Sequence, residues 1–176
     1  RYVHADRILA VRDAGVSLRH ELVHALHFGH MERLGMRRPH PFWIQEGLAT
    51  LFETWDPEAG EPVEGSADAS ADTPRRFTAN DRDPIARRLA EVRGIESLGE
   101  LAAMDARTFM ARGRRHYAVS RAVMRWLEAE GVLEAWYAAL GDAADPDAGI
   151  AAMAAALEEP ATTLDERFRR WLLAET

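Results

Sequence analysis

The sequence predicts a mostly helical α+β protein, and three observations support this. Residues 2–11 have the β-branched, alternating character of a strand. Two segments, 17–34 and 42–53, show helical spacing of apolar residues and carry several histidine and glutamate side chains. Beyond residue 84, apolar residues recur at helical spacing almost to the end of the chain. We therefore expect a short N-terminal β element, a helix pair and a C-terminal helical bundle.

The first three elements are expected in chain order. A single strand is predicted at 2–11, with 7–11 as its core. A helix follows at 17–34 with Ser17 as its N-cap, because a serine hydroxyl can accept a hydrogen bond from a free amide of the first turn. The second helix is predicted at 42–53, and Pro41 suits its entry because proline fixes φ and has no N–H.

A loop and a helical half complete the predicted fold. Residues 56–84 are rich in Pro, Gly, Ala, Ser, Asp and Glu, which is typical of a mobile loop. We expect this segment to be a surface insertion without function, and its position after the helix pair favours the alternative of a flap over a cleft. Ser97 and Glu100 form a capping-box pattern, and Gly131 should end the long helix. The helices expected after the loop are 84–93, 97–104, 114–130, 132–140, 146–157 and 162–174.

Composition indicates one domain and excludes several classes of function. The 176 residues are 47% hydrophobic and 29% charged, enough for one core, so we expect a single domain with a metal-site half at 1–55 and a helical half at 85–176. The net charge of -7 argues against a nucleic-acid partner. No segment has the length and apolarity of a membrane span, and zero cysteines exclude disulfides and thiolate ligands. Because the chain begins at Arg1 without a methionine, we expect it to be part of a longer precursor.

The segment 20–24 has the pattern HExxH, which predicts a zinc site. Positions four apart on a helix lie nearly above one another, so His20 and His24 direct their imidazoles to one point. Glu21 lies about 100° around the helix, where it can act as a base on a metal-held water without coordinating the metal. The simpler alternative is an ordinary helix that carries two unrelated histidines.

A catalytic zinc ion usually has three protein ligands, and two residues compete for the third place. Glu46 is favoured: 21 residues separate it from His24, and the chain between them is long enough to return to the first helix. His30 stands where HExxHxxGxxH sites have their last histidine, but His27 occupies the position at which that pattern requires glycine. We expect His27 and His30 to be polar residues on the outer part of the helix.

The segments RHELVHAL and PFWIQEGLATLFE resemble the gluzincin metallopeptidases, the clan of thermolysin and the M1 aminopeptidases, and especially the bacterial M1-like peptidase MA domains. The resemblance covers roughly residues 1–140. It implies a zincin-like fold, Zn²⁺ as cofactor and hydrolysis of peptide bonds in a peptide or protein substrate. Domains of this type are often exported, which implies an extracytoplasmic location. The residues it assigns are the ligands His20, His24 and Glu46 and the catalytic base Glu21.

The resemblance also suggests the groups around the metal. In M1-like enzymes a tyrosine on a later helix donates to the oxyanion of the tetrahedral intermediate, and Tyr117 lies at a similar place; His116 is the second candidate, since thermolysin-like enzymes use a histidine. Thr50 stands where thermolysin-like enzymes have an aspartate that orients a ligand histidine. Glu53, seven positions after Glu46 on the same helical face, is expected to take this task, and a solvated carboxylate is the alternative.

The sequence departs from the M1 aminopeptidases in one respect and leaves two other classes of function open. Their GxMEN segment, which binds the substrate's free amine, is absent from this chain, so the resemblance implies no aminopeptidase specificity. A domain that keeps the zinc site but serves as a binding or scaffold module is the second hypothesis. A helical interaction domain without a metal is the third. Metal content and peptide hydrolysis together separate the three.

Overall fold

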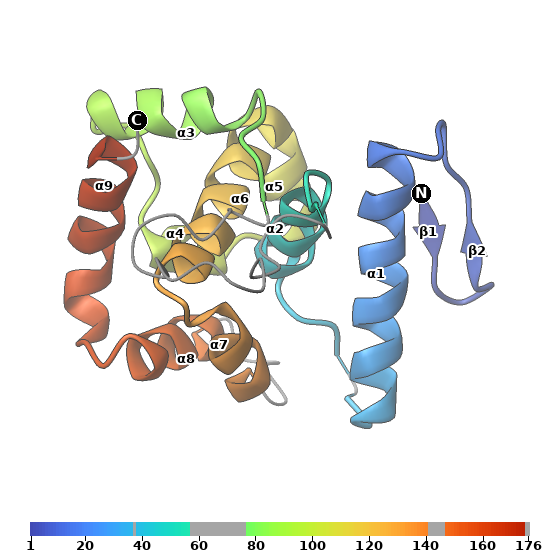
Figure 1. The fold of residues 1–176 in the computed structure, drawn as a ribbon. Coiled ribbons are helices and arrows are strands. Elements are labelled where there is room, and N and C mark those ends of the chain that lie inside the picture. Colours follow the sequence, from blue (N-terminus) through green and yellow to red (C-terminus); the bar gives the residue numbers. More distant parts are fainter. Residues whose placement is uncertain (37, 57–76, 141–146, 175–176) are drawn as a thin grey trace, which may run out of the picture.

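The computed structural model covers the whole chain, and the residues it describes are 1–36, 38–56, 77–140 and 147–174. The fold is mostly helical with a short two-stranded N-terminal sheet, as predicted. In Figure 1 the first helix, α1 (Val16–Arg33), separates this sheet from the other helices, and α2 (Phe42–Phe52) lies next to α1. This arrangement places one face of α1 directly against α2, the second helix of the predicted pair.

The single strand predicted at 2–11 is wrong: this segment is an antiparallel hairpin of β1 (Tyr2–Val3) and β2 (Ile8–Leu9). The amide of Arg7 donates to the His4 carbonyl at 3.1 Å, and Arg7 has a φ of 51°, so a tight turn interrupts the extended run. The Arg7 guanidinium also donates to both carboxylate oxygens of Glu32 on α1, at 3.0 and 3.2 Å. These contacts tie the hairpin to α1.

The start of α1 also differs from the prediction. The helix begins at Val16 with Gly15 at the N-cap position, so Ser17 lies within its first turn. Asp13 Oδ1 accepts hydrogen bonds from the amides of Gly15 at 2.8 Å and Ser17 at 3.2 Å, and thus satisfies a free amide that a cap residue would satisfy. The start of α2 is as predicted, with Phe42 as its first residue and Pro41 at the N-cap position.

The helical half follows the predicted pattern with one addition. The expected capping box of Ser97 and Glu100 is present, and Gly131 adopts a φ of 72° after the long helix. One short helix, α5, was not predicted, because six residues are too few for a helical period to be recognised. Its first turn is capped by Asp105, which accepts from the Thr108 amide at 2.7 Å. The elements are α3 (Asp83–Glu91), α4 (Leu98–Ala102), α5 (Ala106–Ala111), α6 (Gly113–Ala129), α7 (Leu133–Ala139), α8 (Ala148–Ala156), a 3-10 turn (Ala161–Thr163) and α9 (Leu164–Ala174).

The long helix α6 forms the centre of the core and packs along α2. Its residues Val119, Val123, Met124 and Trp126 are fully buried and belong to the core. The helices were expected to bring Tyr117, at the start of α6, towards the predicted site, and α6 lies directly beside the helix that carries Glu46.

A buried arginine joins the end of α2 to α6. The Arg121 side chain is 0% exposed and donates to the carbonyls of Thr50 at 2.5 Å and Leu51 at 3.2 Å. It also donates to Thr54 Oγ1 at 3.0 Å and pairs with Asp83 at 3.2 Å, so its charge is balanced. Carbonyls in the last turn of a helix have no partner within the helix, and Arg121 supplies one. It thereby fixes the α2 end of the predicted site.

Gly47 allows the close approach of α2 and α6, and replacing it with alanine tests this packing. An added Cβ would lie 2.9 Å from the Ser120 carbonyl oxygen and 3.0 Å from Met124 Cε, so the helices must separate. We expect Gly47→Ala to lower the free energy of unfolding by about 1–3 kcal/mol, the usual cost of overpacking a core. Urea unfolding of the metal-free protein measures it. In the control Gly99→Ala, on α4, no atom lies within 4 Å of the added Cβ, and unchanged or slightly raised stability is expected.

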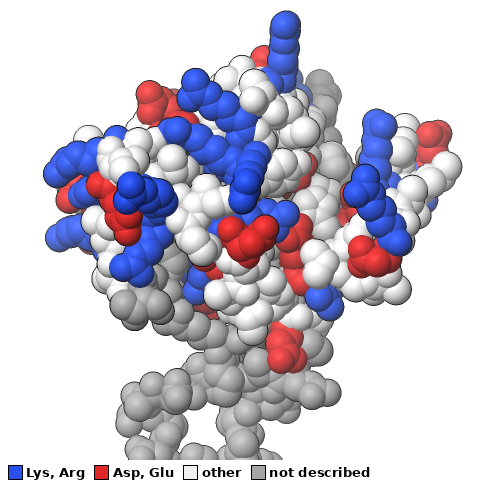
Figure 2. Space-filling view, turned by 90° about the horizontal axis from the view of Figure 1, so that it is seen from above, with Lys and Arg blue, Asp and Glu red and all other residues white. Residues whose placement is uncertain are grey.

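The remaining expectations concern the loop and the surface. Of the loop predicted at 56–84, residues 57–76 lie outside the described part of the chain; its flanks meet in an antiparallel bridge between Trp55 and Phe77. On the face that Figure 2 shows, basic and acidic side chains are interspersed. Arg87 and Arg88 of α3 pair with Glu91 of the same helix. Within the described residues, no helix combines the length and apolarity that a membrane span requires.

Candidate metal centre

The two predicted helices bring His20 and His24 of α1 together with Glu46 of α2. His20 Nε2 and His24 Nε2 are 3.2 Å apart. Glu46 Oε2 lies 3.4 Å from His20 Nε2, and Glu46 Oε1 lies 3.5 Å from His24 Nε2. All three side chains are largely buried, and this cluster could hold a metal ion. The convergence of the two helices that the sequence predicted is therefore present.

The geometry of this cluster fits a tetrahedral ion. Zinc bonds of about 2.0–2.2 Å to nitrogen and oxygen place neighbouring ligand atoms roughly 3.3–3.6 Å apart in a tetrahedron. The two imidazole nitrogens are 3.2 Å apart, and each lies 3.4–3.5 Å from a different oxygen of the Glu46 carboxylate, so these separations lie close to this range. Within the described part of the protein, the buried Glu46 Oε2 has no hydrogen-bond partner, and a cation would compensate its buried charge.

The electrostatics of the cluster follow from its three charged or chargeable groups. Burial lowers the pKa of His20, but the carboxylates of Glu46 and Glu53 outweigh burial and raise it to about 9. Burial raises the pKa of Glu46, whereas hydrogen bonds and charges of His20 and His24 lower it to about 2. The carboxylate is thus ionised at neutral pH, as a metal ligand must be, and a metal that binds His20 must displace its proton.

The Glu53 carboxylate contacts His20 on the side of the ring that faces away from the cluster, as the sequence suggested. Glu53 Oε1 lies 2.9 Å from His20 Nδ1, the ring nitrogen that faces away from the cluster. Glu53 is only 5% exposed, so the alternative of a solvated carboxylate does not apply. Burial raises the pKa of Glu53, but His20 and Arg82 lower it below its ordinary value, which keeps the carboxylate charged. Its contact with the Arg82 guanidinium was not predicted.

Glu21, the predicted base, does not touch the three ligands in this structure. Its Oε2 accepts a hydrogen bond from the Tyr2 amide of β1 at 2.5 Å, and its side chain is 16% exposed. The negative charge of Glu21 nevertheless acts on Tyr117, because it contributes to raising the pKa of the Tyr117 phenol. The Glu21 carboxylate is therefore close enough to Tyr117 for the two groups to interact electrostatically.

The structure places Tyr117 beside Glu46. Burial raises the pKa of the Tyr117 phenol, and the charge of Glu46 together with a hydrogen bond to it raises the pKa further. The hydroxyl also lies 3.7 Å from the sulfur of Met110 and donates to it. A tyrosine with a raised pKa keeps its proton at neutral pH and can donate it in a hydrogen bond.

His116, the second candidate for the same role, lies elsewhere. It is 3% exposed, its Nδ1 is 2.7 Å from the Phe109 carbonyl, and its Nε2 is 3.6 Å from Glu96 Oε1. Neighbouring residues of a helix point about 100° apart, and here that rotation turns His116 towards α5 while Tyr117 faces Glu46. Both nitrogens of His116 are thus engaged within the helical half.

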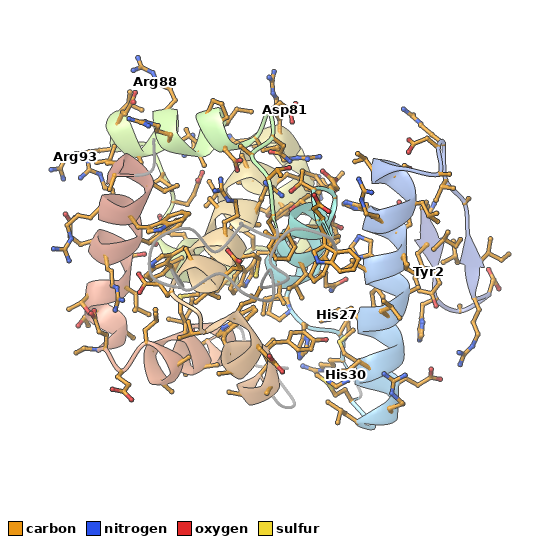
Figure 3. The ribbon with its side chains drawn as sticks, in the orientation of Figure 1. Tyr2, His27, His30, Asp81, Arg88 and Arg93 are labelled. Carbon is orange, nitrogen blue, oxygen red and sulfur yellow. The ribbon has the colours of Figure 1, made fainter. Side chains whose placement is uncertain are left out.

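His27 is buried, contrary to its expected place on the outer part of the helix. Figure 3 shows His27 and His30 on the side of α1 that faces the helical half, whereas Tyr2 lies on the opposite side. His27 is 3% exposed; its Nδ1 lies 2.8 Å from the Tyr137 hydroxyl and its Nε2 lies 3.2 Å from His40 Nδ1. The local pattern gave no signal for Tyr137, which is 110 positions away along the chain.

The burial of His27 predicts a dependence of stability on pH. Burial, followed by the positive charges of His40, His24 and His30, lowers the pKa of His27 from 6.5 to about 3. The unfolded chain takes up a proton here as the pH falls through 6.5, and the folded chain does so only near 3. The unfolded chain therefore binds more protons than the folded chain between these two values. As a result, the free energy of unfolding decreases as the pH falls from 6.5 towards 3, by up to about 1.4 kcal/mol per pH unit.

Urea unfolding of the metal-free parent and of His27→Gln, at about pH 7 and about pH 5.5, measures this effect. We expect the parent to lose more stability than His27→Gln, because glutamine keeps a polar side chain but does not titrate. An equal loss in both proteins would show that His27 is not the group responsible. His20 does not produce the same change. Because its pKa is raised, the stabilisation that it provides is fully present below pH 6.5 and is lost only as the pH rises.

One groove on the described surface lies near the cluster and does not include it. It has a volume of about 890 Å³ and is lined mainly by apolar side chains, among them Leu22, Leu26 and Phe52, with His27 and Tyr137 at one part of its wall. A second cavity of about 650 Å³ is lined by residues of α3, α6 and α9. His20, Glu21, His24 and Glu46 line neither of them.

Comparison with known proteins found no match: neither a family model, nor a curated protein, nor a solved structure is similar to this chain.

Proposed function

We propose that this protein is a zinc-dependent peptidase of the gluzincin type with a zincin-like fold. The observation that carries the proposal is the cluster of His20 Nε2 and His24 Nε2, 3.2 Å apart, with one Glu46 oxygen 3.4 Å from His20 Nε2 and the other 3.5 Å from His24 Nε2. Two imidazoles and one carboxylate are a ligand set of catalytic zinc sites, in which a fourth position stays open for water. The HExxH pattern on α1 supplies a glutamate next to the first ligand.

Each residue has a distinct role in the proposed hydrolysis. A zinc ion held by His20, His24 and Glu46 would lower the pKa of water and polarise the scissile carbonyl. The Glu21 carboxylate accepts the proton of the attacking water and delivers it to the leaving amine. The Tyr117 hydroxyl, which is protonated at neutral pH, donates a hydrogen bond to the carbonyl oxygen as negative charge develops.

Peptide hydrolysis before and after metal removal tests this proposal. The purified protein is incubated with a mixed peptide library, and the products are identified by mass spectrometry. We expect cleavage by the zinc-loaded protein, loss of cleavage after dialysis against a chelator, and recovery when Zn²⁺ is restored. If the protein binds zinc but yields no cleavage products, the result would contradict the proposal and favour the binding module.

The role of Tyr117 predicts a selective kinetic effect. Phenylalanine keeps the ring and its packing but removes the hydroxyl, so Tyr117→Phe should lower kcat by roughly 10²- to 10³-fold, the usual cost of one oxyanion donor. KM and zinc content should change little, because the hydrogen bond strengthens in the transition state. Steady-state kinetics on one cleaved peptide measures this. A silent Tyr117→Phe, with a strong loss in His116→Ala, would assign the donor to His116 instead.

A binding or scaffold domain is the second candidate, and one observation favours it. The Glu21 carboxylate accepts from the Tyr2 amide at 2.5 Å and does not contact the ligand cluster. A base that stayed on the β1 backbone would leave a zinc site without general-base catalysis. Both candidates predict zinc binding, so zinc-dependent peptide hydrolysis and its dependence on Glu21 separate them.

A further inference from the structure

Arg82 is bound to the carboxylate that supports the first histidine of the cluster. Its Nη1 donates to Glu53 Oε2, and its Nη2 donates to Glu53 Oε1 at 3.3 Å, so the two groups meet through both oxygens. A two-point contact between a guanidinium and a carboxylate fixes orientation as well as distance. The same Glu53 Oε1 lies 2.9 Å from His20 Nδ1. Arg82, Glu53 and His20 thus form a continuous chain of contacts that ends at the cluster.

The other end of this chain is anchored in the helical half. Arg82 is the N-cap residue of α3, and its amide donates to Asn80 Oδ1 at 2.9 Å. The Asn80 amide donates in turn to Asp83 Oδ2 at 2.9 Å, and Asp83 pairs with the buried Arg121. The backbone position of Arg82 is therefore set by contacts that do not involve the cluster.

The backbone of Glu53 is held separately from its carboxylate. Arg19 of α1 donates to the Glu53 carbonyl oxygen through Nε at 3.0 Å and Nη2 at 2.8 Å. These bonds fix the position of residue 53 but leave the rotation of its side chain free. Among the described groups, His20 and Arg82 contact the carboxylate, and only Arg82 brings a permanent positive charge to it.

We propose that Arg82 is a positioning residue for the metal centre: it holds the Glu53 carboxylate against His20 Nδ1, so that His20 presents Nε2 to the metal. A carboxylate that accepts from Nδ1–H selects the tautomer whose Nε2 lone pair is free for coordination. Without Arg82, the buried carboxylate loses its counter-charge and one of its two orienting contacts. The inference rests on the proposed zinc site, and it extends that site to a residue 29 positions beyond Glu53.

Zinc affinity in a double-mutant cycle tests the role of Arg82. The dissociation constant for Zn²⁺ is measured by competition with a chromophoric chelator for the parent, Arg82→Gln, Glu53→Gln and the double variant. Each single variant should bind Zn²⁺ about 10- to 100-fold more weakly, as expected for a supporting contact behind a ligand. The double variant should differ from Glu53→Gln by no more than about twofold, because Arg82 acts through Glu53.

Two further variants and a folding measurement make the result specific. Arg88→Gln is the matched control on the same helix, because this arginine is exposed and pairs only locally with Glu91 at 3.0 Å; it should bind Zn²⁺ like the parent. Arg82→Lys keeps the charge but not the two-point contact, so its affinity should lie between those of the parent and Arg82→Gln. Urea unfolding of each metal-free variant identifies any that fails to fold, and Arg82→Lys then replaces Arg82→Gln in the cycle.

The possible outcomes are distinct. Parent-like affinity of Arg82→Gln, or of Arg82→Lys if that variant replaces it, would overturn the proposed role of Arg82. Additive losses in the double variant would do the same, since they would show an effect that does not pass through Glu53. A parent protein that binds no Zn²⁺ would overturn the proposed function itself.

Discussion

Glu21→Gln is expected to lower kcat for peptide hydrolysis by about 10²- to 10⁴-fold while zinc content and folding remain those of the parent. Glutamine has the shape of glutamate but cannot accept the proton of the attacking water. The ligands His20 and His24 are on the same helix but do not contact Glu21, so the site should keep its metal. The measurement is kcat on a cleaved peptide beside zinc content by mass spectrometry.

A matched variant on the same helix provides the control for this prediction. Glu32 is also a glutamate of α1, with 52% of its side chain exposed, and it pairs with Arg7 of the hairpin. Glu32→Gln removes one charge from the same helix without approaching the cluster, so hydrolysis should proceed at the parent rate. If Glu21→Gln cleaves peptides as fast as Glu32→Gln, Glu21 is not the base and the proposed mechanism is wrong.

Glu46→Ala is expected to weaken Zn²⁺ binding by more than about 100-fold and to abolish hydrolysis, because loss of a ligand exceeds the usual effect of a supporting residue. The substitution removes the only carboxylate among the three ligand groups of the cluster. It also removes one of the two charges that raise the pKa of His20 to about 9. Competition with a chromophoric chelator measures the affinity, and the peptide assay measures hydrolysis.

His30→Ala is the control for the choice of the third ligand. His30 is on α1, six positions after His24, and its ring lies 5.5 Å from that of Tyr137, towards α7. Its removal should leave zinc affinity and hydrolysis unchanged. The reverse pattern, with zinc lost in His30→Ala and kept in Glu46→Ala, would show that the third ligand is a histidine.

The residues of the candidate centre that sequence reasoning identified are those that helical geometry relates to one another. His20 and His24 are one turn apart on α1, and Glu46 and Glu53 are two turns apart on α2, so periodicity alone places each pair on one face. The return of the chain between the two helices was predictable from its length and its prolines.

The residues that sequence reasoning missed depend on tertiary packing. Arg82 is 29 positions from Glu53, and Arg121 is 71 and 70 positions from Thr50 and Leu51, whose carbonyls it contacts. Arginine is also common on helix surfaces. Their roles emerge only when α3 and α6 are placed against the end of α2. The burial of His27 has the same cause, because Tyr137 comes from a distant helix.

Two predictions of local structure were wrong because a turn or a neighbouring side chain determined the outcome, and the residue pattern alone did not. The alternation over 2–11 suggested one strand, but the left-handed conformation of Arg7 turns the chain back on itself. Ser17 is a good N-cap residue by type, yet the helix begins one residue before it, and the Asp13 side chain accepts from the amides of Gly15 and Ser17. A propensity describes one residue, whereas these outcomes depend on several neighbours.

Anomalous diffraction at the zinc absorption edge, from crystals of the zinc-loaded protein, tests the central claim most directly. The account predicts one anomalous peak per chain, about 2.0–2.2 Å from His20 Nε2, His24 Nε2 and a carboxylate oxygen of Glu46. A peak coordinated by His30 instead of Glu46, or no peak between α1 and α2 in zinc-loaded crystals, would contradict it.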